Sequence, residues 1–595
     1  MTIQDGAGHL ARGDVASAER VAQTLLARNE DPDALHLMAL TRIRQNRVEE
    51  ALPFFSRSLA ARPHHPHVRF NLGKALALLK RDAEAAAALE QAIRLDPRLA
   101  AAWYELGEVQ LRRQQAKEAE ASFRQVLALD PEHLLAKLSL GVLLKDNGKP
   151  AAGEPLLAQG LARAEDPHLK AGFAYNLAQC QYALGKKENA LENFNLVRQL
   201  EPSRSSVEIN LTDLFEEMGR FEEAEARLAA LLRREPENED AHQAYNDLMH
   251  RLGRDADFLS SYARAPATPA LLASKAAFLF KTGRFAEAFD VYARVVQDDP
   301  GNLAAAIGAA SCLNQAGRHG EAMARLEQVR NHHPESPVVF HSLSATALQM
   351  RDPKLAAAFA EQSLRLAPVD HAGLAFLGSA WRMMGDERDE MLNGYEDLIG
   401  ILDLEVPQGF SSMAEFNGAL SNALDAMHRT SREPIAQSLR GGSQTRGNIF
   451  NDGIELVERL KARINEAMRA YIGSIRPDAR HPFRGRATAS YRFTGSWSSR
   501  LKDCGYHINH IHPEGWISSC YYVAVPEAVK NDETKEGWIK FGEPSVEAGL
   551  GFRRAIQPQP GRLVLFPSYM WHGTIPFHDK AVRTTIAFDA VPVTP

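Results

Sequence analysis

Prolines recur through the first two-thirds of the chain at an almost constant spacing. Six of the nine intervals are 34 residues long, and the ten prolines are Pro63, Pro97, Pro131, Pro167, Pro202, Pro236, Pro266, Pro300, Pro334 and Pro368. An alanine precedes eight of them by twelve residues, and Pro155 and Arg254 take its place in the other two. Because proline ends a helix and alanine lets two helices approach closely, this period predicts a series of stacked helical pairs.

The segment 100–133 shows the repeated unit most clearly. Its landmark residues are Trp103, Leu106, Gly107, Ala119, Phe123 and Pro131. In this pattern the segment resembles the tetratricopeptide repeat, a helix-turn-helix unit. The resemblance implies about ten such units, a degenerate unit in residues 1–32 and a diverging one after His371, stacked into a superhelix. The irregular spacings at 146–170 and 239–267 indicate either a bend or interruption of the stack, or neutral drift.

A stack of this kind exposes an extended concave surface that suits an extended chain. We therefore expect a peptide or protein partner in the repeat groove. The alternative is a rigid arm that dimerises or shields a second domain, and the oligomeric state, a homodimer included, is left open. A formal net charge of −6 gives no electrostatic reason for nucleic acid or an anionic membrane to be a partner.

The cysteines and the N-terminal segment bear on the compartment. The four cysteines, Cys180, Cys312, Cys504 and Cys520, contain no Cys-x-x-Cys pair and are too sparse for a disulfide framework. The sequence shows no basic segment followed by an apolar core at its start, and no run of about 18 apolar residues. We therefore expect a cytoplasmic protein with reduced thiols.

The repeat landmarks vanish after about residue 385, and the pattern changes. One apolar helix face is predicted by Ile454, Val457, Leu460, Ile464, Met468, Tyr471 and Ile475. From Arg484 onward, short β-branched and aromatic runs alternate with turn residues, which predicts an antiparallel sandwich or barrel. The predicted strands are Arg486–Phe493, Gly505–His510, Trp516–Val525, Gly537–Phe541, Phe552–Gln557, Arg562–Phe566 and Thr584–Val591.

Histidines and one arginine in this last region have a spacing suited to metal chemistry. If His510 and His512 lie on a strand, its period of two directs both side chains to the same face. His572 would come from a distant strand, and three neutral imidazoles on one side of a metal ion leave the opposite positions open. Arg583 and Thr585, two residues apart on a later strand, can offer a guanidinium fork and a hydroxyl to a carboxylate.

Four segments together resemble the Fe(II)/2-oxoglutarate-dependent oxygenases, in particular oxygenase domains that follow tetratricopeptide repeats. They are Gln437–Thr445, His507–Ser518, Phe566–His572 and Arg583–Asp589. The resemblance implies a multidomain α + β protein. An N-terminal all-α tetratricopeptide superhelix would span residues 1–385, and a linker with connecting helices would span 386–435. A C-terminal double-stranded β-helix (jelly-roll) oxygenase domain with supporting helices would span 436–595.

The same resemblance assigns ligands and cofactors. It implies Fe(II), 2-oxoglutarate as co-substrate and O2, with no catalytic residue beyond the metal and co-substrate ligands. The expected ligands are His510, His512 and His572 for Fe(II), Arg583, Thr585 and Tyr491 for 2-oxoglutarate, and Arg440 and Gln444 for the substrate.

The chain departs from the family pattern at its first metal element. These oxygenases usually carry His-x-Asp or His-x-Glu, whereas this chain has His510 and His512, with Glu514 two residues further on. The alternative ligand set is therefore His512, Glu514 and His572, in which a carboxylate would neutralise one charge of the metal. Pro513 opposes that alternative, because proline can end the strand and turn Glu514 away.

The expected function is hydroxylation of a peptide, protein or small-molecule substrate, with the repeats recruiting a partner or the substrate. Halogenation and desaturation use the same kind of iron site and stay open. One alternative is a non-catalytic tetratricopeptide scaffold with a degenerate β-helix domain. Another is a cupin-like module with three histidines and no oxo acid, against which Arg583 and Thr585 argue.

Overall fold

The computed structural model describes residues 2–593, and it divides into two compact units. The first unit ends at Arg204 and the second begins at Ser205. The first is built from helical pairs, and the second combines further helical pairs with two antiparallel sheets. Among the described residues, no helix is both long and apolar enough to cross a membrane.

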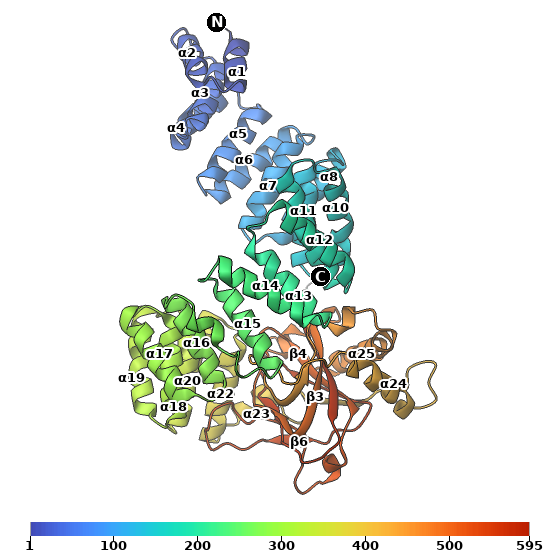
Figure 1. The fold of residues 1–595 in the computed structure, drawn as a ribbon. Coiled ribbons are helices and arrows are strands. Elements are labelled where there is room, and N and C mark those ends of the chain that lie inside the picture. Colours follow the sequence, from blue (N-terminus) through green and yellow to red (C-terminus); the bar gives the residue numbers. More distant parts are fainter. Residues whose placement is uncertain (1, 594–595) are drawn as a thin grey trace. The chain divides into compact units, whose positions relative to one another are not determined.

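The first unit is a succession of antiparallel helix pairs, coloured blue to blue-green in Figure 1. Gly107 and Phe123 show why the repeat needs a small residue, because a Cβ at Gly107 would lie 2.6 Å from a ring carbon of Phe123. The helices are α1 (Ile3–Ala11), α2 (Val15–Leu26), α3 (Pro32–Arg44), α4 (Val48–Ala61), α5 (Pro66–Leu78), α6 (Asp82–Leu95), α7 (Ala100–Arg112), α8 (Ala116–Leu129), α9 (Leu134–Asp146), α10 (Pro150–Arg163), α11 (Pro167–Ala183) and α12 (Lys187–Leu200).

The second unit continues the series of pairs. Its repeat helices are α13 (Ser205–Glu217), α14 (Phe221–Arg234), α15 (Glu239–Arg251), α16 (Pro269–Lys281), α17 (Phe285–Asp298), α18 (Leu303–Gln315), α19 (His319–His332), α20 (Pro337–Gln349), α21 (Pro353–Leu366), α22 (His371–Met384) and the short α23 (Arg388–Asn393). The predicted repeat helices are thus confirmed, and the diverging last unit is the pair α22 and α23.

The two irregular spacings have different outcomes. At 146–170 the helix α10 runs through Pro155 without a break. At 239–267 the second helix of the pair is replaced by a single 3-10 turn, η1 (Ser260–Ala263). Arg254 stands where the repeat expects a buried alanine, and it forms ion pairs with Glu225 at 2.5 Å and Asp257 at 2.7 Å instead of packing between helices. The interruption therefore coincides with one of the two residues that broke the alanine pattern.

Two antiparallel sheets form the C-terminal part. The larger has the strand order β1-β7-β4-β9-β3-β2 and the smaller β6-β5-β8. Their strands are β1 (Gly400–Asp403), β2 (Leu439–Gln444), β3 (Tyr491–His507), β4 (Ile517–Ala524), β5 (Ile539–Phe541), β6 (Arg554–Ile556), β7 (Arg562–Pro567), β8 (His572–Thr574) and β9 (Arg583–Pro592). The sequence predicted repeated helices followed by an antiparallel β domain with supporting helices. This fold class is confirmed.

Several predicted strand bounds are wrong. Parts of the runs Arg486–Phe493 and Gly505–His510 belong to one long strand, β3, and β8 is the strand that was expected, without bounds, to carry His572. The glycine-rich segment from Leu439, for which no strand was predicted, is strand β2 with a bulge between Arg440 and Gly442. Glycine is needed there, because a Cβ on Gly442 would lie 2.1 Å from a backbone oxygen.

The larger sheet has two differently covered faces. Helices α24 (Met413–Asp425) and α25 (Glu455–Ser474) pack against one face, where Ile586 and Phe588 join their apolar cluster. Val564 and Phe566 of β7 project from the other face and cluster with Phe541 of the smaller sheet. In Figure 1, helices α24 and α25 lie on one side of the strands and repeat helices α16 to α22 on the other. A cavity between the sheets is therefore walled by both.

Residues 386–435, expected as a linker, contain regular elements. Strand β1 forms an edge of the larger sheet by pairing with β7. Helix α24 contributes Phe416, Leu420 and Leu424 to the apolar cluster on that sheet. The domain boundaries at 385 and 435 stay a prediction.

Candidate metal centre

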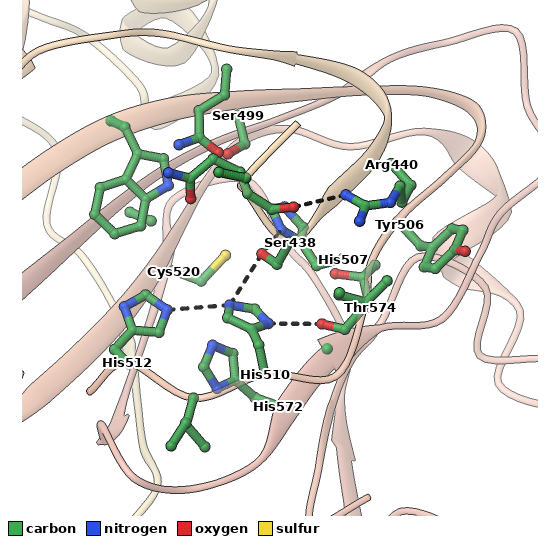
Figure 2. A pocket seen from close by; sticks show the side chains of 18 of the residues that line it. Ser438, Arg440, Ser499, Tyr506, His507, His510, His512, Cys520, His572 and Thr574 are labelled. Atoms are coloured by element: carbon green, nitrogen blue, oxygen red, sulfur yellow. Dashed lines mark hydrogen bonds between the residues drawn. The ribbon is translucent and has the colours of Figure 1, made fainter. Parts of the chain in front are cut away.

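Three imidazoles meet in the space between the two sheets. His510, His512 and His572 each offer a ring nitrogen, and these atoms all lie within 4.8 Å of one another. The Nε2 atoms of His510 and His512 are 3.2 Å apart, as Figure 2 shows. His510 was expected on a regular strand. Instead, it forms an isolated bridge with His572. This bridge joins the two separated sequence elements at the centre.

A hydrogen bond orients each of these rings from behind. Nδ1 of His510 lies 2.7 Å from the carbonyl oxygen of Ile508, and Nδ1 of His572 lies 3.0 Å from that of Met570. For His512 the partner is a carboxylate oxygen of Asp589, at 2.6 Å. Because these acceptors require a proton on Nδ1, each Nε2 keeps its lone pair for a metal ion.

Burial keeps the rings of His510 and His572 neutral. It lowers the pKa of His510 to about 3, and the neighbouring His512 adds to the shift. The pKa of His572 is held well below its ordinary value by burial first and then by the other two histidines. Neutral imidazole is the form that binds a metal ion, so these two rings can bind one without losing a proton.

Arg583 lies in the same cavity, whose volume is about 1040 Å³. The residue is 1% exposed, and its Nε has no hydrogen-bond partner. Within residues 2–593, no carboxylate forms an ion pair with it. Thr585 lines the cavity beside it, and the ring of Tyr522 lies 5.0 Å from the guanidinium carbon. A buried cation without a counter-charge is costly, so this position fits an anion from outside the chain.

The other expected site residues are placed differently. Arg440 and Gln444 line the cavity, whereas Tyr491 does not. The hydroxyl of Tyr491 donates to Oδ1 of Asn465 at 2.7 Å, on the side of the sheet covered by α25. Glu514 lines the outer cavity but is exposed in a turn and is not among the three clustered ligands. The ligand assignment itself stays a prediction.

Some residues of the site were not singled out from the sequence. Asp589 shares a face of β9 with Arg583 and Thr585, so the period of two starting at Arg583 is the signal that could have found it. Tyr522 of β4 pairs in register with Thr585. His371 of α22 gave no such signal, and its Nδ1 lies 2.8 Å from the backbone oxygen of His512.

A second contact of α22 lies next to the centre. Nε1 of Trp571, the neighbour of His572, donates to the backbone oxygen of Ala375 and to Oγ of Ser379, both at 3.1 Å. The last long repeat helix therefore supports both segments that carry the histidines.

Family models match both parts of the chain. Residues 495–589 match the model described as "Putative 2OG-Fe(II) oxygenase". Models described as "Tetratricopeptide repeat" match residues 6–66, 36–98, 83–133 and 138–204, and also 188–248 and 279–345. The chain is thus a tetratricopeptide repeat protein that ends in a domain of the 2OG-Fe(II) oxygenase family.

No curated protein matches this chain. Among solved structures, YrrB, a "TPR protein with an unusual peptide-binding site", is 21% identical with a TM-score of 0.30, over 32% of this chain and 96% of that one. PilF of Pseudomonas aeruginosa is 20% identical with a TM-score of 0.32, over 34% and 92%. The Cut9–Hcn1 hetero-tetramer of the APC/C is 15% identical with a TM-score of 0.33, over 79% and 84%.

Proposed function

We propose that the C-terminal domain is an Fe(II)- and 2-oxoglutarate-dependent oxygenase that hydroxylates a peptide, protein or small-molecule substrate. One observation carries the proposal: a buried guanidinium without an internal counter-charge, that of Arg583, shares a cavity with three convergent Nε2 atoms. A site for an anion beside a site for a metal ion is what a chelating oxo acid requires.

The residues present fit the metal. His510, His512 and His572 would hold it, since neutral imidazoles suit Fe(II) and their Nε2 atoms converge. When bound, Fe(II) together with 2-oxoglutarate and O2 supplies the oxidising chemistry. Asp589 fixes the ring of His512 and places a negative charge next to a set of ligands that carries none.

The chain holds the co-substrate by charge and keeps water out by apolar contact. Arg583 would pair with the distal carboxylate of 2-oxoglutarate, and Thr585, 2% exposed, would add its hydroxyl. Ile539 and Phe566 line the same cavity and belong to the apolar cluster between the sheets. Arg440 and Gln444 would contact the substrate, and the repeats would recruit it or a partner.

Anaerobic binding tests the proposal directly. Fe(II) and 2-oxoglutarate are titrated into the metal-free protein, and we expect one equivalent of each to bind. Arg583→Gln should keep the metal and lose 2-oxoglutarate, because only the anion site is removed. Arg492→Gln changes an exposed arginine of the neighbouring strand β3 and should bind both.

Aerobic turnover completes the test. The loaded protein should form succinate from 2-oxoglutarate, and mass spectrometry of offered substrates should find an added oxygen atom. A non-catalytic scaffold would take up neither Fe(II) nor 2-oxoglutarate, and that result would exclude the proposal.

A further inference from the structure

Repeat helices build part of the cavity that contains the candidate metal centre. Phe280, Lys281, Gly283 and Phe285, around the turn between α16 and α17, line it together with Gln315 at the end of α18. These residues face the same space as Arg440 of β2 and Tyr506 of β3. The wall of the candidate substrate site is therefore shared between the repeats and the sheets.

Two cations in this outer part have no acidic partner. Arg440 donates from Nη1 to the backbone oxygens of Gln437 and Leu439, both at 2.7 Å, which leaves its other nitrogens available. Neither Arg440 nor Lys281 forms an ion pair within the described part of the chain. The pKa of Lys281 is lowered, first by desolvation and further by repulsion from Arg440, while Asp247 opposes the shift. Both cations line the same cavity.

The acidic residues of the cavity do not compensate them. Both carboxylate oxygens of Asp589 are occupied, one by Nδ1 of His512 at 2.6 Å and one by the hydroxyl of Ser518 at 2.7 Å. Glu514 is exposed in its turn and pairs with neither cation. Figure 2 shows Arg440 and Tyr506 beside each other, on the opposite side of His507 from His512. A positive region therefore lies beside the imidazoles.

Apolar surface adjoins the two cations. The rings of Phe280 and Phe285 meet edge to face with their centroids 5.1 Å apart. Ile508, which also lines the cavity, is 38% exposed, and Ile511, three residues further on, lines the cavity too. A cavity of about 1040 Å³ is at the upper end of the range for small-molecule sites, which leaves room for a substrate beside a small dicarboxylate.

We propose that the substrate carries a carboxylate next to an apolar group, and that Lys281 and Arg440 hold the carboxylate while Phe280 and Phe285 contact the apolar group. This inference rests on the proposed oxygenase function and names the substrate class of that site. The repeats then select the substrate as well as recruit it. An acidic side chain of a peptide and a small carboxylic acid share this chemistry, and the test distinguishes the two sources.

Binding is measured on the full chain, first without metal and then with Fe(II) and 2-oxoglutarate under anaerobic conditions. One arm uses two degenerate peptide pools that differ only in Glu or Gln at fixed positions beside Leu and Phe. The other arm compares phenylacetic acid with phenylacetamide. We expect about tenfold tighter binding of the carboxylate form in at least one arm, as a charge-assisted contact gives.

Variants connect the preference to the named residues. Lys281→Gln and Arg440→Gln should each reduce the preference for the carboxylate, and the charge reversal Lys281→Glu should invert it toward a pool with Lys in place of Glu. Lys354→Gln, an exposed lysine of α21 outside the cavity, should leave it unchanged.

The outcomes separate this inference from the proposed function. Equal binding of carboxylate and amide, binding unaffected by Lys281→Glu, or no binding in either arm would overturn the substrate class. If Fe(II) and 2-oxoglutarate still bind to the same preparation, the oxygenase proposal survives that result.

Discussion

Nδ1 of His512 lies 2.6 Å from the carboxylate of Asp589, so a negative charge acts on the candidate metal centre from behind one of its ligands. The related oxygenases that the sequence resembles usually have a carboxylate as a ligand at the position of His512. Here the carboxylate is on strand β9 and is held in place by the hydroxyl of Ser518 at 2.7 Å. The negative charge is retained, but it lies on Asp589, which contacts the candidate ligand His512 and is not itself a candidate ligand.

The first prediction concerns this carboxylate. Asp589→Asn removes the charge and leaves the proton on Nδ1 of His512 without its acceptor, so the affinity for Fe(II) should fall by about 10- to 100-fold. Competition with a chelator measures the affinity. Asp532→Asn, an exposed acid on the same domain, is the control and should change nothing. An unchanged affinity in Asp589→Asn would show that the hydrogen bond does not act on the metal.

The second prediction concerns the uncompensated cation. Arg583→Met removes a buried charge without breaking an internal ion pair, so the Tm of the protein without ligand should stay equal or rise. Adding 2-oxoglutarate with a divalent metal should raise the Tm of the wild type, by mass action, and not that of the variant. A marked loss of Tm in Arg583→Met without ligand would mean that the guanidinium has a structural role instead.

The third prediction concerns a charged contact between repeat helices and the β2 segment. Arg446, just after β2, pairs with Asp213 at 2.8 Å and with the buried Glu216 at 2.9 Å, and Arg251 pairs with Glu216 and Asp247. Burial raises the pKa of Glu216, which shows how costly its charge is.

Arg446→Ala should therefore lower the free energy of unfolding by about 3 kcal/mol, because it leaves buried acids in excess. Arg432→Ala removes an exposed pair with Asp255 at 2.6 Å in the same connecting segment, and it should cost less than about 1 kcal/mol. Urea denaturation of the two variants gives the comparison, and equal losses would contradict the role of burial.

The fourth prediction concerns pH. The ring nitrogens of His428 lie 2.8 Å from Oγ of Ser443 and 3.0 Å from Oγ of Ser498, and burial lowers its pKa to about 4. The unfolded chain binds a proton near its ordinary pKa of 6.5, whereas the folded chain does not until about 4. Stability is therefore complete above the higher value and is lost as the pH falls between the two.

For this one group, the loss between about pH 7 and about pH 5 should be on the order of 2 kcal/mol. His428→Gln should show a correspondingly shallower pH dependence in urea denaturation, since the other buried histidines are common to both proteins. His578→Gln, an exposed residue, should follow the wild type. A parallel dependence in His428→Gln would show that His428 titrates normally.

The repeats could be predicted from the sequence because their contacts are local. An alanine or glycine at a fixed offset decides how two neighbouring helices pack, and Arg254, where that offset failed, marks the place where a helix is missing. The apolar face from Ile454 to Ile475 likewise predicted α25, since one helix period decides its burial.

The candidate site was predicted less completely. The order of His510, His512, His572 and Arg583 in the sequence predicted a metal site beside an anion site. The segments that surround these residues come from elsewhere in the chain. The contacts of Lys281 and His371 join segments more than a hundred residues from the centre, and no local period reports such a contact. Tyr491 and Tyr522 both lie on strands of the larger sheet, and only the register of β4 with β9 places the second beside Arg583.

The contacts of α22 have a practical and an evolutionary consequence. Its His371 holds the backbone of one histidine segment and its Ala375 and Ser379 hold the other. An expression fragment that starts beyond this helix would lack the hydrogen-bond partners of Trp571, even if its β-strands still formed. Loss or duplication of repeats during descent should accordingly be tolerated at the far end of the array and resisted at its junction with the β domain.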